Sequence, residues 1–304
     1  MSKIKVYVRA LRTYSFTITV VQIILGTFIA LWEIRGLKFN VLNFILALLG
    51  AIIVHGAANV LSDYYDYKKK VDREGTYGSS GVLVEKLLTL KEAFTYAIFL
   101  FFLSFLIALY FVFTSPNSFV LILIILTGAL FGIFYTAGPV AFKYKALGDI
   151  AVFIAFGPIM TLGAYFVQAY KFSWTPIIFS IPLALLVDAV LHGNNLRDID
   201  NDKKVNIKTI PIILGEERAK RIYYFLIVSA YIVQFLLIIL THLPYYTLLT
   251  IFSIPLGFKL IEMVKKKDRI DSKEFALIDM YTSKFHLTFG FLFIFGLLIS
   301  FLVQ

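Results

Sequence analysis

The sequence predicts an all-α polytopic membrane protein, built as a nine-transmembrane-helix bundle with a lipid-accessible central cavity. Of its 304 residues 60% are hydrophobic, and the mean hydropathy is +0.84. The apolar residues come in blocks of roughly 20, the length that crosses the hydrocarbon core of a bilayer. The blocks lack the period-2 alternation of barrel strands, so each is expected to be a helix that satisfies its own backbone groups.

Nine such blocks follow one another, and residues 1–304 are interpreted as a single membrane domain. The blocks are Ser15–Leu31, Val41–Leu61, Ala93–Phe113, Phe119–Ala137, Leu147–Ala169, Thr175–Leu191, Ile222–Leu240, Tyr245–Val264 and Phe285–Val303. Basic residues precede the first block and no small-residue cleavage site follows it. This block is therefore predicted to be a retained helix rather than a signal peptide.

The distribution of basic residues predicts the orientation. With a cytoplasmic N-terminus, 26 of the 29 Lys and Arg residues fall on the cytoplasmic side, and only Arg35, Lys38 and Lys171 on the other. This asymmetry follows the positive-inside rule and puts the C-terminus on the opposite side of a cell membrane. Topology and anionic lipid headgroups explain the net charge of +10, so no nucleic acid is expected as a partner. The chain has no cysteine, which excludes disulfides and thiolate ligands.

The second block ends in a polar stretch. Asn59 is followed four residues later by Asp63, which on a helix stacks the amide and the carboxylate on one face, and Asp66 and Asp72 come next. His55, one turn before Asn59, can belong to this polar site or be a hydrogen-bonded packing histidine. The loop that follows contains glycines at 75, 78 and 81, which suggest a pliable lid or a backbone that approaches a ligand closely.

The third and fourth blocks are interpreted as scaffold. The fourth contains Tyr135 near its end, and the loop after it contains Lys143 and Tyr144. These side chains can reach a diphosphate or an aromatic ring, although lysines in a short inner loop are also ordinary topology markers. The fifth block contains Gly157-Pro158, which predicts a kink.

The sixth block leads into a second polar stretch with the same residue types and spacing. Asn194 precedes Asp198 by four residues, and Asp200 and Asp202 follow. Asp188, deeper in the block, is a functional candidate because an ionisable residue at that depth is costly, or it is simply paired with His192 one turn later. The last three blocks carry few internal charges, and the basic loop from Lys265 to Lys273 is interpreted as membrane-surface packing.

The two acidic stretches together indicate a metal site. Facing carboxylates repel each other unless a divalent cation lies between them. Ligand sets made only of oxygen favour a hard cation, and Mg²⁺ in particular is usually held by a few carboxylates and the phosphates of a substrate. The sequence therefore predicts a Mg²⁺–diphosphate site at a membrane surface.

The combination of motifs resembles the UbiA superfamily of intramembrane prenyltransferases over nearly the whole chain, including the helix count. The resemblance rests on Asn59-x-x-x-Asp63-x-x-Asp66, Tyr135-Thr136-Ala137-Gly138-Pro139, the segment 143–149 and Asn194-Asn195-Leu196-Arg197-Asp198-x-x-x-Asp202. The Asn-Asn-Leu-Arg-Asp string and the Lys-Tyr-Lys loop are most similar to the 1,4-dihydroxy-2-naphthoate prenyltransferases of menaquinone biosynthesis. The sequence departs from the family pattern at Ser62, at Lys70 and two residues before Lys208. These departures do not affect the first Asp of each cluster, but they leave the identity of the acceptor open.

The resemblance implies transfer of a prenyl group from a polyprenyl diphosphate to an aromatic acceptor, through an allylic carbocation. Asp63 and Asp198 are then the catalytic residues. The implied Mg²⁺ ligands are Asn59, Asp63, Asp66, Asp198 and Asp202. The implied diphosphate contacts are Arg12, Lys68, Lys143 and Arg197, and Tyr135, Tyr144 and Asn194 are candidates for contacts to the acceptor or the carbocation. Asp72 and Asp198 are both candidates for the base, and no protein partner is required.

Other functions stay open at the level of the sequence. A cation transporter would use the same carboxylates, but it predicts acidic residues at mid-membrane rather than at one surface. A CDP-alcohol phosphotransferase would need an Asp–Gly–Ala-rich signature that the chain lacks. Among prenyltransferases, a 4-hydroxybenzoate-like phenol, a haem vinyl group or geranylgeranylglyceryl phosphate are alternative acceptors.

Overall fold

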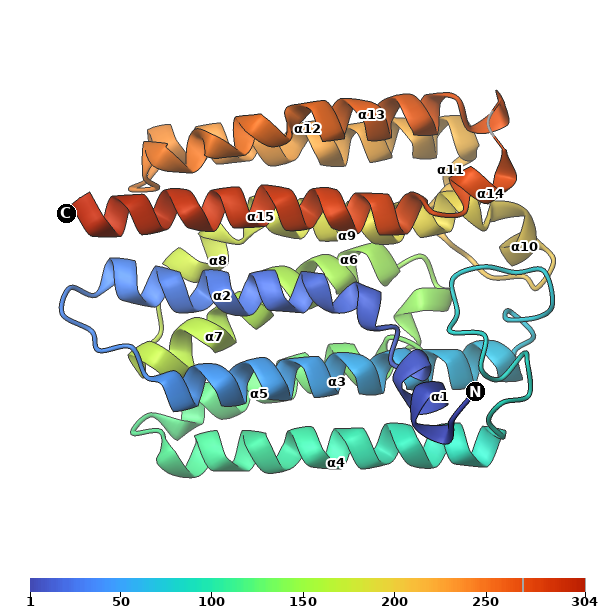
Figure 1. Ribbon diagram of the computed structural model, residues 1–304, viewed down its shortest axis with the longest axis horizontal. Helices are drawn as coiled ribbons and strands as arrows, with labels where there is room; N and C mark the ends of the chain where they lie inside the picture. The colour runs from blue at the N-terminus through green and yellow to red at the C-terminus, as the bar shows by residue number, and fades with distance from the viewer. Residues whose placement is uncertain (270, 304) are drawn as a thin grey trace.

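The expected all-α architecture is confirmed in the computed structural model, which describes residues 1–269 and 271–303. The longest helices run side by side along the long axis of the molecule (Figure 1). They are α2 (Phe16–Glu33), α3 (Val41–Lys68), α4 (Leu90–Thr114), α12 (Glu216–Leu240) and α15 (Ile278–Val303).

Among the residues that the structure describes, seven helical segments are long and apolar enough to cross a bilayer. They are Thr13–Glu33, Val41–Lys68, Leu90–Thr114, Gly148–Ala169, Glu216–Leu240, Tyr245–Lys265 and Lys273–Val303. The fourth and sixth predicted blocks differ. The fourth forms the shorter helix α5 (Ser118–Phe134), and the sixth is divided into α8 (Thr175–Phe179) and α9 (Ile181–Arg197). The division occurs at Ser180, whose hydroxyl donates to Ile177 O at 2.7 Å, and Pro182 then starts the new helix, where a missing N–H costs nothing.

The predicted irregularity at Gly157-Pro158 is confirmed. A single π-helical turn, Ala155–Ile159, separates α6 (Gly148–Ile154) from α7 (Met160–Ala169) and contains Pro158. Gly157 lies against α9, where a Cβ at this position would be 2.3 Å from Ala184 Cβ. Only glycine allows the two helices to approach this closely.

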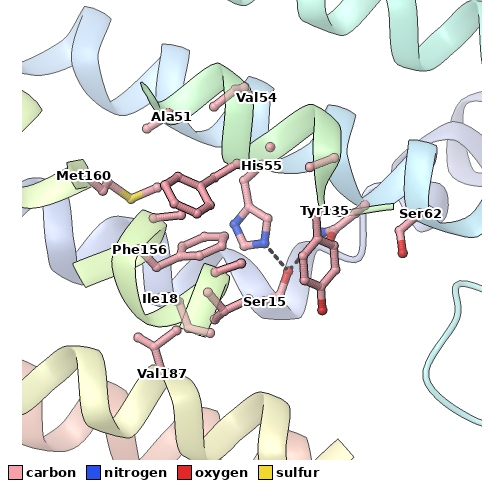
Figure 2. Close-up of a pocket in the computed structure, with 18 of the residues that line it drawn as sticks. Ser15, Ile18, Ala51, Val54, His55, Ser62, Tyr135, Phe156, Met160 and Val187 are labelled. Atoms are coloured by element: carbon pink, nitrogen blue, oxygen red, sulfur yellow. Dashed lines mark hydrogen bonds between the residues drawn. The ribbon is translucent and has the colours of Figure 1, made fainter. Parts of the chain in front are cut away.

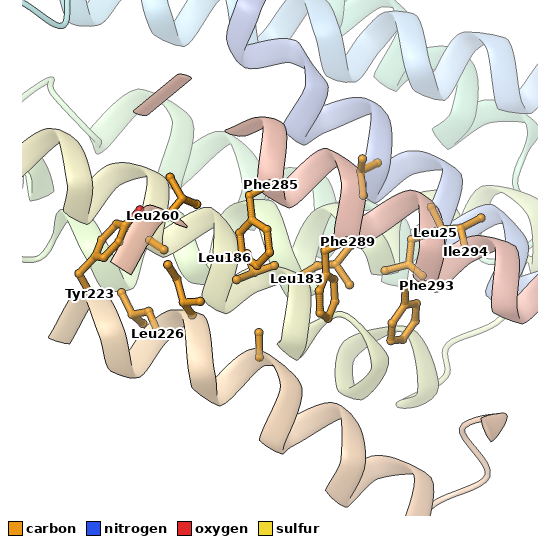
Figure 3. Packing of buried hydrophobic residues seen from close by; sticks show 14 of the residues in the cluster. Leu25, Leu183, Leu186, Tyr223, Leu226, Leu260, Phe285, Phe289, Phe293 and Ile294 are labelled. Carbon is orange, nitrogen blue, oxygen red and sulfur yellow. The ribbon is translucent and has the colours of Figure 1, made fainter. Parts of the chain in front are cut away.

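The larger hydrophobic core joins α2, α9, α12 and α15. Phe285, Phe289 and Phe293 follow one another along α15 at a spacing of four residues, next to Leu183 and Leu186 of α9 (Figure 3). All five side chains are buried. A second core joins α1 (Lys3–Ala10), α3 and α4. The outward side of α4 exposes a run of apolar side chains, as expected for a helix that faces lipid: Phe94, Ile98, Phe99, Phe102 and Leu106.

The polar loops gather at one end of the bundle, which we call the polar end. It comprises α1, the loop 69–89, α10 (Ile199–Lys203) and α11 (Ile210–Leu214), all on the right of Figure 1. The link between α13 (Ile254–Lys265) and α15, which includes α14 (Ser272–Phe275), returns to the same end. Since α3 and α9 both finish here, the two acidic stretches lie at the same end of the molecule.

Candidate active site

A cavity of about 630 Å³ extends from the polar end into the bundle. At its mouth the lining includes Asn59, Asp72, Asn194, Asp198 and Asp202, so residues from both acidic stretches share one space. From there the cavity extends between α3, α4, α5 and α7, where its walls are apolar and include Leu46, Val54, Phe105, Ile124, Gly163 and Val167. Figure 2 shows Tyr135, Phe156, Met160 and Val187 around its middle part. The shape suits a molecule with an anionic head and a long apolar tail.

Asp63 is buried just behind the mouth and is held by two different segments. Its Oδ1 accepts from the guanidinium of Arg12, and its Oδ2 accepts from the Ser80 hydroxyl and from Ser80 N at 3.0 Å. Ser80 lies in the loop 69–89, so this carboxylate anchors the loop over the cavity. Sequence reasoning missed Ser80, although the glycines around it indicated a backbone that approaches a ligand closely. In the structure Gly78 has a φ of 92°, and a Cβ there would lie 2.7 Å from Arg197 Nη2.

Asp66 is the most buried carboxylate of the first stretch, with 1% of its surface exposed. Its Oδ2 lies 2.5 Å from Lys143 Nζ and accepts from Ser62 Oγ at 3.0 Å, and its Oδ1 accepts from the Tyr144 hydroxyl at 2.9 Å. Burial disfavours the charged form of Lys143, but the combined attraction of Asp66, Tyr135 and Asp72 outweighs it and raises the pKa of the lysine. The predicted loop residues Lys143 and Tyr144 thus hold the first stretch from across the site.

Asp198 lies at the junction of α9 and α10 and pairs with its neighbour Arg197. The guanidinium donates to both carboxylate oxygens, from Nε at 2.9 Å and from Nη2 at 2.7 Å. Nη1 of the same arginine donates to Ala276 O at 3.1 Å and lies 3.4 Å from Asp279 Oδ2. The start of α15 therefore contributes a carboxylate that the sequence analysis did not single out.

Asp72 and Asp202 differ from Asp63, Asp66 and Asp198. Within residues 1–269 and 271–303, neither has a lysine or arginine nitrogen within 4.0 Å. Burial raises the pKa of Asp72 to about 7, helped by repulsion from Asp66 and Asp63. Burial and repulsion from Asp198 raise the pKa of Asp202 to about 7. These two carboxylates thus have no cationic partner among the described residues.

The donor set fits a hard cation. In the part of the chain that the structure describes, no three carboxylate or imidazole side chains converge on one point. Mg²⁺ does not require this, because it is commonly held by one or two carboxylates while substrate phosphates supply the remaining ligands. Two observations favour such a site. Within residues 1–269 and 271–303, Asp72 and Asp202 are not neutralised by a cation, and the buried Oδ1 of Asn194, which lines the cavity, has no hydrogen-bond donor. Oxygen atoms of this kind are what a magnesium ion bound to diphosphate needs.

The other candidate residues are distributed as follows. Arg12, Arg197, Lys143 and Tyr135 line the cavity. Burial raises the pKa of Tyr135 to about 12, so its ring is a neutral phenol. Lys68 lies outside the lining, exposed above the ring of Tyr64 with Nζ 5.8 Å from the centroid, and the structure does not bring it to the other cations.

The suggested pairing of Asp188 with His192 is wrong. His192 Nδ1 lies 2.9 Å from Asp149 Oδ1, and Nε2 lies 3.0 Å from Ala219 O. Asp149 Oδ2 also accepts from Asn195 at 3.3 Å. A residue one turn away on the same helix was the nearest partner by sequence, but α6 packs against this face and supplies Asp149 instead.

Comparisons with known proteins agree with this geometry. Residues 23–301 match the UbiA prenyltransferase family. UbiA prenyltransferase domain-containing protein 1 from Xenopus tropicalis is 31% identical over 98% of this chain and 83% of its own length, and the protein of the same name from Homo sapiens is 30% identical over 97% and 83%. The structure of a UbiA homolog from Archaeoglobus fulgidus bound to GPP and Mg2+ has the same fold, with a TM-score of 0.67 and 18% identity over 96% of this chain and 99% of that one. The chain is an enzyme of the UbiA prenyltransferase family.

Proposed function

We propose that this enzyme transfers a prenyl group from a polyprenyl diphosphate to 1,4-dihydroxy-2-naphthoate, as in menaquinone biosynthesis. The observation that carries the proposal is the meeting of two acidic stretches, more than 120 residues apart in sequence, at the mouth of an apolar cavity that also presents Arg12, Lys143 and Arg197. Family membership and the solved homologue with GPP and Mg2+ support the donor class.

The proposed ligands of Mg²⁺ are Asn59, Asp63, Asp66, Asp198 and Asp202. When bound, the metal makes diphosphate a better leaving group by neutralising the charge that develops as the C–O bond breaks. Arg12, Lys143 and Arg197 act in the same direction, because their cationic groups line the mouth, where they can exchange their carboxylate partners for the departing diphosphate oxygens. Lys68 is not among the proposed diphosphate contacts, because it lies outside the cavity.

The apolar walls have a second role in this scheme. Breaking the C–O bond leaves an allylic carbocation, which water would quench. Tyr135 and Phe156 line the cavity close to the polar mouth, and their ring faces attract a cation while the surrounding aliphatic side chains exclude water. The acceptor ring then forms the new C–C bond, and it loses CO₂ if the attacked carbon bore a carboxyl, or otherwise a proton. Asp72 and Asp198 are the proposed bases.

The naphthoate acceptor is favoured by the Asn-Asn-Leu-Arg-Asp string and by the 30–31% identity to UbiA prenyltransferase domain-containing protein 1 over almost the whole chain. A digeranylgeranylglyceryl phosphate synthase shares the fold at 20% identity, which is too low to favour its substrate. Family membership speaks against the transporter alternative.

We also infer the membrane arrangement. The chain is a multi-pass membrane protein, and we propose a single domain with nine crossings, in which α5 and the α8–α9 pair supply the two beyond the seven long spans. The distribution of lysine and arginine favours a cell membrane with the polar end on the cytoplasmic side.

The experiment is a transfer assay with purified protein, labelled geranylgeranyl diphosphate and a panel of acceptors, in Mg²⁺ and in EDTA. We expect label on 1,4-dihydroxy-2-naphthoate in Mg²⁺ and none in EDTA. Label on another acceptor alone would refute the proposed substrate, and transfer that is unchanged in EDTA would refute the role of the metal.

A further inference from the structure

His55 lies on α3 one turn before Asn59 and forms part of the cavity wall (Figure 2). Its ring is 7% exposed, and its centroid lies 4.7 Å from that of Phe156 in an edge-on arrangement. Nδ1 lies 2.7 Å from Thr19 Oγ1, and Nε2 lies 3.2 Å from Ser15 Oγ. Both ring nitrogens are therefore engaged, and neither is free to ligate a metal or to take a proton from a substrate.

The hydrogen bonds of Ser15 determine which ring nitrogen of His55 carries the proton. Ser15 Oγ lies 2.9 Å from the carbonyl oxygen of Arg12, which can only accept, so the single hydroxyl proton of Ser15 is committed there. The Ser15 oxygen must then accept its remaining hydrogen bonds. His55 Nε2 consequently carries a proton and donates it, and the bare Nδ1 accepts from the hydroxyl of Thr19. The ring is held as the neutral Nε2–H tautomer.

The same serine also receives the side chain of Asn59. Asn59 Nδ2 donates to Ser15 Oγ at 3.1 Å and to Leu11 O at 2.9 Å, so both amide hydrogens are used. These two bonds fix which end of the amide is nitrogen, and Oδ1 is the atom left over. Asn59 lines the cavity, and no group in residues 1–269 or 271–303 donates to its Oδ1.

We propose that His55 is a positioning residue, which acts through Ser15 to hold Asn59 with its amide oxygen available to the metal–diphosphate complex. The inference rests on the proposed function, because that function assigns Asn59 as a ligand. Without the bond from His55, Ser15 can rotate and offer its proton elsewhere, and Asn59 loses one of the two acceptors that orient it. The amide would then sample the flipped arrangement, in which Nδ2 rather than Oδ1 faces the cation.

The chain offers a matched control in His286. This second histidine is fully buried in α15, and neither of its ring nitrogens has a hydrogen-bond partner among the described residues. It does not line the cavity. The substitution His286→Leu removes a buried imidazole from the bundle, as His55→Leu does, but it leaves Ser15 and Asn59 untouched.

The first readout is metal binding rather than turnover. Mn²⁺ is titrated into purified protein in lipid nanodiscs with an unreactive geranylgeranyl thiodiphosphate, and free Mn²⁺ is measured by electron paramagnetic resonance. We expect His55→Leu and Ser15→Ala to weaken Mn²⁺ binding about 10–100-fold, the usual effect of losing a partner that orients a metal ligand. The double variant should be no weaker than either single one, because both changes remove the same interaction. His55→Gln, whose side-chain amide can donate to Ser15, and His286→Leu should stay within about threefold of the wild type.

The second readout is the tautomer itself. Nitrogen NMR of protein labelled with ¹⁵N-histidine distinguishes the two neutral tautomers, and we expect the resonances lost in His55→Leu to be those of an Nε2–H imidazole. An Nδ1–H tautomer would overturn the proposal. So would a loss of Mn²⁺ affinity in His55→Leu no larger than in His286→Leu, or a His55→Gln variant as weak as His55→Leu. A wild-type protein that binds no metal with the analogue would instead refute the proposed function.

Discussion

At the scale of single residues, three carboxylates of the candidate site, Asp63, Asp66 and Asp198, are paired with the protein's own cations. Asp63 pairs with Arg12, and Asp198 pairs with Arg197. Replacing Asp63 by alanine would leave Arg12, whose side chain is only 14% exposed, with no counter-charge, and so would destabilise the fold as well as the chemistry. The isosteric asparagine is therefore the better test.

We expect Asp63→Asn and Asp198→Asn each to lower kcat/KM for prenyl transfer by at least about 10³-fold, or roughly 4 kcal/mol of transition-state stabilisation. The reason is that an amide oxygen carries no charge to offer the metal. The control is Asp200→Asn, because Asp200 is exposed and does not line the cavity although it lies between Asp198 and Asp202. A fall in activity for Asp200→Asn as large as for Asp198→Asn would argue against the assignment.

A second pair of variants separates the two lysines of the 143–149 loop. Lys143 reaches Asp66 inside the site, whereas the exposed Lys145 bonds to Pro139 O at 3.2 Å. We expect Lys143→Met to raise KM for the prenyl diphosphate about tenfold or more, since it removes a cation at the mouth, and Lys145→Met to leave it unchanged. Steady-state kinetics with varied donor provide the measurement. Equal effects of the two substitutions would mean that only the overall charge of the loop matters.

Residue types and their spacing were enough to single out the two polar stretches that line one cavity, while the roles of their residues stay a prediction. The polar face of Asn59 and Asp63, and the same spacing in Asn194 and Asp198, follow from helical geometry alone. Spacing could not predict which cation meets which carboxylate, since Arg12, Lys143 and Arg197 come from three separate segments. It also gave the wrong partner for His192, because tertiary packing brings Asp149 closer than Asp188.

At the scale of helices, several contacts depend on the absence of a side chain. A Cβ at Gly26 of α2 would lie 2.2 Å from the carbonyl oxygen of Thr161 and 2.8 Å from Ala164 Cβ. The close atoms belong to the backbone and to a short side chain of α7, so they cannot turn aside. Helix α2 can only accept a larger residue here by moving away from α7.

We therefore expect Gly26→Ala to destabilise the protein by about 1–3 kcal/mol, the usual cost of overpacking, and to lower its thermal midpoint in detergent. Gly132→Ala in α5 is the control, because a Cβ there meets no atom within 4 Å, and alanine favours the helix. Thermal unfolding followed by size-exclusion chromatography compares the two. If both variants melt at the wild-type temperature, the α2–α7 contact is looser than described.

Sequence patterns predicted the helices well where the apolar block was long and uninterrupted. They were less accurate at Ser180, where one block became two helices. A hydropathy pattern reports only the apolar surface available to lipid or core. The break depends on a local bond from the serine hydroxyl and on the missing N–H of Pro182, which hydropathy does not register.

At the scale of the whole molecule, the cavity runs along much of the bundle. Its lining includes Asn59 and Leu46 of α3, which at the rise of an α-helix are about 20 Å apart. Phe111, Leu121 and Val167, which form a buried hydrophobic cluster, also line the cavity. A long isoprenoid tail can therefore be accommodated while its diphosphate stays at the polar end.

Filling this cavity should change the preferred donor length. Gly163 lines it on α7, where a Cβ would meet only Ile124 at 3.6 Å, so the side chain of Gly163→Phe would enter the cavity. We expect this variant to lose at least about tenfold in kcat/KM with geranylgeranyl diphosphate and to keep near-normal activity with dimethylallyl diphosphate, which ends before the obstruction. Kinetics with donors of increasing length test it, and an equal loss for all donors would place the tail elsewhere.

The overall architecture could be expected largely because the motifs resemble a known family. Hydropathy alone predicts helices but not which of them enclose a space. Asp72 and Asp202 line the same mouth because of the paths of the loop 69–89 and of the short helix α10. Neither segment has a periodic pattern from which its path could be predicted.

The internal ion pairs at the polar end also bear on turnover. In the ligand-free protein Asp63, Asp66 and Asp198 are bonded to Arg12, Lys143 and Arg197. On the proposed function, the same three cations exchange these carboxylates for diphosphate oxygens and return to them when the diphosphate leaves. The site would then act as an ion exchanger: re-forming the pairs would compete with the product diphosphate for the cations and so favour its departure after each cycle.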